Sequence, residues 1–218
     1  MQTLLFIHGF ATGPAVWQKQ IQAFSKVYNI ITEPDQIDCF DSLFVVGWSL
    51  GGWKAIEIGT QHPQKVKGLV LVSAFAKYLK SDDYPYGTSA ALLRKLERKF
   101  IANYKTGLHY FYDLVFRTKQ LHYLIDALPS PATDEIKRWF EKLKNEDKRE
   151  TLAKLNLPVL LIHGDQDRIS PVGNSKFMQA RIPQAKLCIL NGVGHAPMFE
   201  ASAIFNSHLR KFIESHAG

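Results

Sequence analysis

Short runs of aliphatic residues alternate with amphipathic stretches through the first third of the chain and again through its last part. Each run is rich in Leu, Ile and Val and too short for a helix, which is the pattern of a buried strand. The stretches between the runs place apolar side chains at helical spacing. Strands that alternate with helices indicate βαβ units and a mostly parallel sheet. The expected strands are residues 4–8, 28–32, 43–47, 68–73, 159–163 and 186–190, and the expected helices are 15–26, 51–62, 172–180 and 203–215.

The middle of the chain, residues 77–150, carries no strand signal. From 92 to 115, leucines and aromatic residues recur at helical spacing with basic residues between them. Two prolines separate this part from another expected helix at 134–144. The sequence therefore predicts a single α/β domain over 1–218 with a helical insertion at 77–150. The apolar stripe of the insertion is expected to pack on the sheet domain, with room for a few of its aromatic residues to line a pocket.

Composition places the chain among ordinary globular proteins, with 218 residues of which 46% are hydrophobic. No apolar run approaches the roughly 20 residues that span a bilayer, and the first residues read as a strand rather than a signal peptide. We therefore expect a cytoplasmic monomer that makes no membrane contact. Cys39 and Cys188 form no metal-spaced motif and are interpreted as reduced thiols, so no metal site is expected.

The net charge of +7 is unevenly distributed along the chain. Between residues 94 and 119, seven basic side chains accompany only two acidic ones, which gives this segment a net charge of +5. The basic residues are Arg94, Lys95, Arg98, Lys99, Lys105, Arg117 and Lys119. Such a segment is either a solvated helix face or a docking surface for an acidic partner. No nucleic-acid reader motif accompanies it, so nucleic-acid binding is not expected.

The segment Gly47-Trp48-Ser49-Leu50-Gly51 gives the strongest indication of chemistry. It has the G-x-S-x-G pattern and lies between an expected strand and an expected helix, the setting in which such a serine acts as a nucleophile. The turn is so sharp that the serine backbone is strained, and only very small residues two positions away leave room for it. The strain holds the hydroxyl above the sheet edge, where a base can reach it and the helix N-terminus can stabilise an anion.

An activated serine needs a histidine base and an acid that orients the base. His195 follows the strand expected at 186–190, and both Asp165 and Asp167 follow the preceding strand. Because the carboxyl ends of parallel strands meet at one edge of a sheet, we expect these loops to lie beside Ser49. Either aspartate fits the role of acid by position, although Asp165 also fits a turn-stabilising residue.

Two further histidines lie near strand ends. His8 and His163 each precede a glycine turn and are interpreted as residues that shape a loop.

The reaction also needs an oxyanion hole. One expected donor is the backbone N–H of Leu50, directly after the nucleophile, and the other is the N–H of Phe10, since Gly9 lets the chain turn inward there. The Phe10 side chain then either closes over the acyl group or packs in the core.

Four segments resemble the α/β-hydrolase superfamily, and together they extend across essentially the whole chain. They are residues 8–10 (HGF), 47–52 (GWSLGG), 164–171 (GDQDRISP) and 194–197 (GHAP). Within the superfamily the chain is most similar to the BioH-type pimeloyl-[acyl-carrier protein] methyl ester carboxylesterases of biotin synthesis. That likeness depends on Trp48 and Leu50 beside the serine, on the H-A-P at 195–197, and on residues 98–102, which resemble a segment of that family's lid.

The resemblance implies an α/β-hydrolase fold, with a mostly parallel sheet flanked by helices and the insertion as a helical lid. It also selects Asp167 as the acid beside Ser49 and His195, because the family pattern G-x-x-D-x-x-x-P matches 164–171. The chain starts at what is the third strand of the superfamily, so the sheet is expected to be trimmed at its N-terminal side. Residues 33–42 are just too few for a full crossover helix and are expected to form mostly loop or a single turn.

In that family, basic lid residues meet the acyl-carrier protein and a phenylalanine lines the acyl channel. Acyl-carrier proteins are acidic, which suits a lid segment of charge +5. The residues implied for carrier docking are Arg94, Lys95, Arg98 and Lys99. The residues expected to bind substrate are Phe10, Trp48, Phe100, Tyr104 and Phe111.

The expected function is therefore that of a serine carboxylesterase that hydrolyses the methyl ester of pimeloyl-[acyl-carrier protein] through an acyl-serine intermediate, with no cofactor. The alternatives are a general carboxylesterase or thioesterase acting on small esters, and an acyltransferase of the same fold. A non-catalytic ligand-binding protein is a more remote alternative, since such proteins usually lose a member of the triad.

Overall fold

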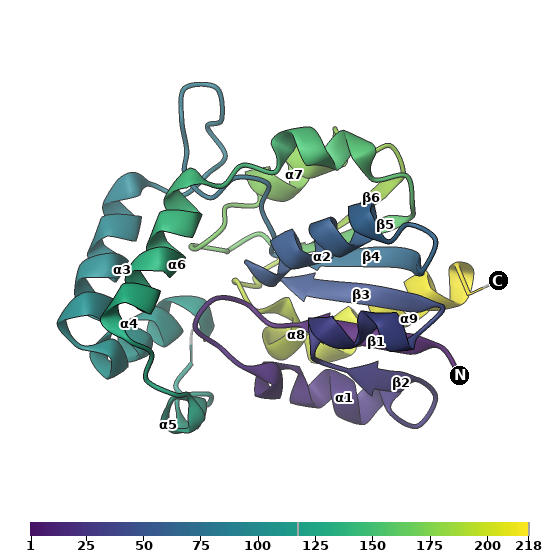
Figure 1. Ribbon diagram of the computed structural model, residues 1–218, viewed down its shortest axis with the longest axis horizontal. Helices are drawn as coiled ribbons and strands as arrows, with labels where there is room; N and C mark the ends of the chain where they lie inside the picture. Colours follow the sequence, from purple (N-terminus) through teal and green to yellow (C-terminus); the bar gives the residue numbers. More distant parts are fainter. Residues whose placement is uncertain (117, 218) are drawn as a thin grey trace.

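The computed structural model describes residues 1–116 and 118–217 as a central sheet with helices on both faces and a group of helices at one end (Figure 1). Arg117, one of the basic residues counted above, and Gly218 lie outside the described residues.

Six parallel strands form one sheet in the described part of the chain, in the order β2-β1-β3-β4-β5-β6. The strands are nearly continuous runs of Leu, Ile, Val and Phe, as expected where both faces of a parallel sheet are covered. This confirms the expected fold class. The strands are β1 Thr3–Ile7, β2 Asn29–Ile31, β3 Leu43–Trp48, β4 Val66–Val72, β5 Val159–Gly164 and β6 Ala185–Leu190.

Helices cover the two faces of the sheet and build two separate cores. Alternate strand residues point to opposite faces, so Leu4 and Phe6 of β1 enter the core under α1, α8 and α9, whereas Leu5 and Ile7 enter the core under α2, α7 and η3. The α-helices are α1 Gln18–Phe24, α2 Gly51–Gln61, α3 Ala90–Ala102, α4 Tyr104–Phe116, α5 Tyr123–Ala127, α6 Thr133–Asn145, α7 Gly173–Gln179, α8 Pro197–Glu200 and α9 Ser202–Ser215, and the 3-10 helices are η1 Pro14–Trp17, η2 Pro34–Cys39 and η3 Arg149–Lys154.

Three local details differ from the sequence expectations. The helix expected at 15–26 is divided into η1 and α1, with Pro14 in the first turn, where its missing N–H costs no hydrogen bond. Strand β4 starts two residues before Gly68, its expected first residue. Gly68 leaves room for a neighbouring helix, since a Cβ there would lie 2.9 Å from the Phe212 ring of α9. The short connection at 33–42 contains η2, a six-residue 3-10 helix, rather than only a loop or a single turn.

Helices α3, α4, α5 and α6 all lie between β4 and β5 in the chain and sit beyond the carboxyl ends of the strands (Figure 1). An antiparallel bridge between Lys77 and Asp147 holds the two ends of this segment together. Helices α3 and α4 approach closely at Gly107, where a Cβ would lie 2.7 Å from the Cα of Phe100. These helices therefore form a layer of their own next to the loops that follow the strands. In the described residues, no helix is long and apolar enough to cross a membrane.

Candidate active site

Ser49 lies in the turn between β3 and α2 with a positive φ of 54°, a strained conformation for a residue other than glycine. The chain fits there only because its neighbours lack side chains. A Cβ on Gly47 would lie 2.5 Å from the carbonyl oxygen of Gly51, and a Cβ on Gly51 would lie 2.5 Å from that of His8. The Ser49 N–H donates to the Val72 carbonyl of β4 at 2.8 Å, which fixes the turn to the sheet. The sharp turn inferred from the sequence is thus present.

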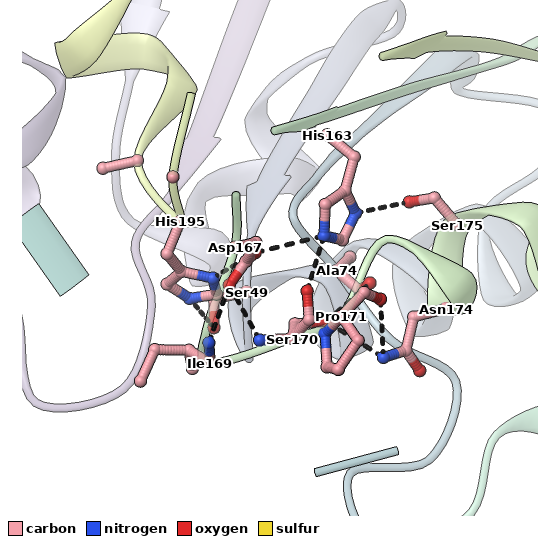
Figure 2. Close-up of polar contacts among 12 residues, drawn as sticks. Ser49, Ala74, His163, Asp167, Ile169, Ser170, Pro171, Asn174, Ser175 and His195 are labelled. Carbon is pink, nitrogen blue, oxygen red and sulfur yellow. Dashed lines mark hydrogen bonds and ion pairs between the residues drawn. The ribbon is translucent and has the colours of Figure 1, made fainter. Parts of the chain in front are cut away.

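Two hydrogen bonds connect Ser49 to an imidazole and a carboxylate (Figure 2). The Ser49 hydroxyl lies 2.9 Å from Nε2 of His195, and Nδ1 of His195 lies 2.7 Å from Oδ2 of Asp167. Because a carboxylate only accepts, Nδ1 carries the proton and Nε2 is left free to accept from the serine. The three side chains come from the loops after β3, β5 and β6, and all are buried.

Asp167 remains ionised although it is buried. Its Oδ1 accepts the backbone N–H groups of Ile169 and Ser170 at 2.8 and 2.9 Å, and its Oδ2 faces both His195 and His163. Burial alone would raise the pKa of Asp167, but the charge of His195 and the hydrogen bonds from both histidines hold it well below its ordinary value. An ionised carboxylate at this position can stabilise a positively charged imidazole.

The second aspartate of the loop has a different partner. Oδ1 of Asp165 accepts the N–H of Gly192 at 2.7 Å and so connects the loop after β5 to the loop that carries His195. Glu200 of α8 supports the same loop, since its carboxylate accepts the N–H groups of Gly194 and Ala196 at 3.0 and 3.3 Å. Glu200 was not among the expected site residues, and the only sequence signal for it is its position just after the H-A-P segment.

Two backbone N–H groups next to Ser49 have the arrangement of an oxyanion hole. The loop after β1 passes directly over the serine. The two segments are so close that a Cβ on Gly9 would lie 3.2 Å from the Ser49 Cβ. Within the described residues, neither Phe10 N–H nor Leu50 N–H donates a hydrogen bond. Both donors are therefore available to a substrate oxygen at the start of α2, whose dipole favours negative charge there.

Comparisons with known proteins show the family of the chain. The profile of the family "Serine aminopeptidase, S33" matches residues 8–202. The chain belongs to the α/β-hydrolase superfamily. Proteins named pimeloyl-[acyl-carrier protein] methyl ester esterase are similar to it: the one from Nitrosomonas europaea is 28% identical, covering 89% of this chain and 88% of its own. The one from Neisseria meningitidis is 30% identical, covering 78% and 68%.

Solved structures show the same fold. An esterase from Exiguobacterium antarcticum superimposes on this hydrolase with a TM-score of 0.87 at 18% identity, over 98% of this chain and 92% of that chain. A bromoperoxidase from Bacillus anthracis does so with a TM-score of 0.86 at 23% identity, over the same shares of the two chains.

The hydrolase has two hollows near Ser49, and Phe10 and Leu50 line both. The one that touches Ser49 is apolar and has a volume of only about 10 Å³, whereas admitting a single water needs roughly 10–15 Å³. The other is a groove of about 630 Å³ between α2 and α6 that does not touch Ser49. The groove is the larger of these two hollows, but Ser49 lines only the small one, and Phe10 lines both.

Phe10 is surrounded by aromatic rings from the helical insertion. Its ring centre lies 5.4–5.6 Å from those of four residues, Phe100, Phe111, Trp139 and Phe140. Of the residues expected to bind substrate, Phe111 lines the small cavity with Phe10, and Tyr104 lines the groove. Phe100 lines neither hollow and packs behind Phe10. Trp139 and Phe140 were not among the expected residues, although their helix was.

Trp48 lies behind the histidine rather than at either hollow. Its indole N–H donates to the backbone carbonyl of His195 at 2.8 Å, and its ring packs against the imidazole with centres 5.5 Å apart. Its position in this structure is that of a support for the His195 loop.

The residues expected to dock a carrier lie on α3. Arg94, Lys95 and Arg98 are exposed, Lys99 is half-buried, and the ammonium groups of Lys95 and Lys99 lie 5.0 and 4.7 Å from the centre of the Tyr110 ring. None of these four residues lines the groove.

Proposed function

We propose that the hydrolase cleaves the methyl ester of pimeloyl-[acyl-carrier protein] through an acyl-serine intermediate on Ser49. The observation that supports the chemistry is the unbroken pair of hydrogen bonds from Ser49 through His195 to Asp167. The observation that supports the substrate is that relatives similar over most of this chain are named for that ester. The protein is a carboxylesterase, in agreement with the esterases that are similar over most of this chain.

In the first half of the reaction, Oγ of Ser49 attacks the ester carbonyl while Nε2 of His195 takes the hydroxyl proton. The N–H groups of Phe10 and Leu50 stabilise the negative charge that develops on the carbonyl oxygen. Asp167 holds the imidazole in the required tautomer and stabilises its positive charge. The intermediate collapses, His195 returns the proton to the leaving alkoxide, and methanol departs.

In the second half, His195 takes a proton from water, and the resulting hydroxide attacks the acyl-serine carbonyl. The same two N–H groups hold the second oxyanion. The bond between Oγ of Ser49 and the carbonyl carbon breaks, and His195 gives its proton to Oγ. The carboxylic acid then leaves, and Ser49 is restored.

The acyl chain is proposed to reach Ser49 from the groove between α2 and α6. The groove wall contains Trp53, Tyr104 and Trp139, whose apolar surface suits a methylene chain. Since Phe10 and Leu50 are shared by the groove and the cavity at Ser49, a displacement of the Phe10 ring would join the two.

The basic residues of α3 are proposed to attract the acidic carrier. Arg94 and Arg98 are four residues apart on one exposed helix face, and Lys95 and Lys99 lie beside them. Exposed charges of one sign accelerate encounter with an oppositely charged protein and make it sensitive to salt.

The test compares pimeloyl-[acyl-carrier protein] methyl ester with dimethyl pimelate, which lacks the carrier, in wild type and Ser49→Ala. We expect a kcat/KM at least about tenfold higher on the carrier ester, falling with salt concentration, and no cleavage of either ester by the alanine variant. Equal rates on the two esters would leave a general carboxylesterase. No cleavage of either by wild type would favour acyl transfer or ligand binding.

A charge-reversal pair tests the docking surface. Arg94→Glu with Arg98→Glu should raise KM for the carrier ester by roughly tenfold at low salt and leave dimethyl pimelate unaffected. Lys186→Glu with Lys211→Glu, which changes two exposed lysines of β6 and α9 outside the insertion, is the control matched in net charge. An equal effect of both changes would mean that only net charge matters and that α3 is not the docking face.

A further inference from the structure

A second buried histidine contacts the acid of the triad and has no part in the mechanism above. His163 is the penultimate residue of β5, four residues before Asp167, and is fully buried. Its Nε2 lies 3.1 Å from Oδ2 of Asp167, the same oxygen that His195 contacts, and 2.7 Å from the carbonyl oxygen of Ser170. Figure 2 shows the two imidazoles on either side of Asp167.

The protonation state of this ring follows from its neighbours. Both groups that face Nε2, a carboxylate and a backbone carbonyl, only accept hydrogen bonds, so Nε2 carries a proton. On the other side, Nδ1 lies 2.7 Å from the hydroxyl of Ser175 in α7, which is also buried. In a neutral ring with its proton on Nε2, Nδ1 accepts a hydrogen bond from the Ser175 hydroxyl, and all polar atoms of the pair are satisfied.

We propose that His163 is a positioning residue that holds the Asp167 carboxylate and limits how strongly it attracts the proton of His195. Asp167 accepts two backbone N–H groups at Oδ1 and the Nδ1–H of His195 at Oδ2, and the Nε2–H of His163, which also faces the Ser170 carbonyl, lies 3.1 Å from the same Oδ2. Contacts at both oxygens hold the carboxylate in the orientation that faces His195. This inference depends on the proposed roles of Ser49, His195 and Asp167, but not on the identity of the natural ester.

The two histidines share one oxygen, and this has a measurable consequence. A donor on Oδ2 withdraws part of the negative charge that would otherwise stabilise protonated His195. Without the His163 donor, the Asp167 carboxylate should stabilise a positively charged imidazole more strongly. The acid limb of the pH–rate profile should therefore move upward.

Two other titratable groups, Glu200 and Tyr78, lie beside this network. Glu200 is fixed to the Gly194 and Ala196 N–H groups. Tyr78, which faces Asp167, remains a neutral phenol, because burial raises its pKa above the ordinary value.

Substitution of His163 by glutamine or asparagine distinguishes the contact made at Nε2 from the contact made at Nδ1. In His163→Gln the amide nitrogen reaches about as far as Nε2 and can still donate to Asp167, whereas in His163→Asn it reaches only about as far as Nδ1. The readout is the pH dependence of the rate at which a fluorophosphonate labels Ser49, which needs His195 as a base and no natural substrate. Failure of the carrier proposal therefore does not affect this test.

We expect His163→Asn to slow labelling by roughly tenfold and to move the acid limb upward by about half a pH unit. His163→Gln should stay within about threefold of wild type, with the acid limb near its wild-type position. The proposal would be overturned if a folded His163→Asn protein kept the acid limb of its pH–rate profile at the wild-type position. It would also be overturned if the glutamine variant were as impaired as the asparagine variant. A purely structural role would lower the melting temperature without moving the limb.

A measurement on wild type covers the case in which the asparagine variant does not fold. In a sample with 15N-labelled histidines, His163 should show a protonated Nε2 and an unprotonated Nδ1, and its Nε2–H resonance should shift as His195 titrates. An unprotonated Nε2, or a resonance indifferent to His195, would contradict the inference.

Discussion

At the scale of single residues, the active-site loop shows how two identical side chains acquire different tasks. Asp165 and Asp167 are two positions apart, yet the first accepts the N–H of Gly192 and the second faces His195. Both carboxylates connect the loops after β5 and β6, but only Asp167 touches the imidazole. We therefore expect loss of the Asp167 charge to affect the chemistry and loss of the Asp165 charge to affect the support of the loop.

The matched pair Asp167→Asn and Asp165→Asn should separate these tasks. We expect the first to lower kcat on a p-nitrophenyl ester by roughly 10³–10⁴-fold, because an amide neither fixes the tautomer nor stabilises the imidazolium. The second should lower kcat by less than about tenfold, through a looser His195 loop. Steady-state kinetics on both variants makes the comparison, and similar losses would mean that the loop matters and the acid does not.

Gly47, two residues before Ser49, is a second residue whose substitution has a predictable effect on stability. In Gly47→Ala the new Cβ would lie 2.5 Å from a backbone oxygen of α2, so the turn must move, at a cost of about 3 kcal/mol in the free energy of unfolding. Gly13→Ala is the control, because its nearest atom is 3.5 Å away and its φ of −136° suits alanine. Urea unfolding should show a clear loss for the first and little change for the second; equal midpoints would contradict the steric account.

At the scale of elements, the loop after β1 connects the sheet to the helical insertion. Its backbone passes over Ser49, and its Phe10 side chain packs among rings of α3, α4 and α6. In the proposed mechanism, the same residue offers a main-chain donor to the oxyanion, and its side chain lines both the groove and the cavity at Ser49. Movement of α6 would change access to Ser49 through this ring.

Shortening that ring should change the preference for chain length. Phe10→Leu keeps the backbone N–H and opens the path from the groove, so kcat/KM for an eight-carbon p-nitrophenyl ester should rise severalfold relative to a four-carbon one. Phe100→Leu removes a ring from the same cluster but lines neither hollow, and should lower stability by about 1–2 kcal/mol without altering the ratio. An unchanged ratio in the Phe10 variant would show that the acyl chain reaches Ser49 by another route.

At the scale of the whole molecule, the buried charge of Asp167 links folding to pH. The folded protein holds the pKa of Asp167 below its ordinary value, so the unfolded chain binds this proton more readily. The group therefore stabilises the fold at pH values above about 4, the ordinary value for aspartate, and this contribution is lost as the pH falls below it.

Comparing wild type with Asp167→Asn across pH 3 to 7 tests this linkage. The asparagine variant lacks the titrating group, so its urea midpoint should fall less steeply below about pH 5 than that of wild type. Parallel curves would mean that Asp167 is not a charged, stabilised carboxylate in the fold.

Much of the architecture was predictable because it depends on local rules. Continuous aliphatic runs identified the strands, and glycines on either side of Ser49 identified the turn, since only they fit its sterics. The errors came where a distant element decided the local outcome. Gly68 was expected to be the first residue of its strand, yet it lies inside β4, where the Phe212 ring from α9 occupies the space that a side chain would need.

The sequence by itself determined the strand–turn–helix around Ser49, the order of the loops that carry Asp167 and His195, and the helical character of the insertion. These features follow from periodicity and from steric limits within a few residues. The tertiary structure decided that Trp48 supports His195, that Phe10 lines both the groove and the cavity at Ser49, and that His163 shares Asp167 with His195. Ser49 and His195 are 146 residues apart in the chain. Such contacts depend on the order of the strands and on how the lid helices pack over them, which no local pattern encodes.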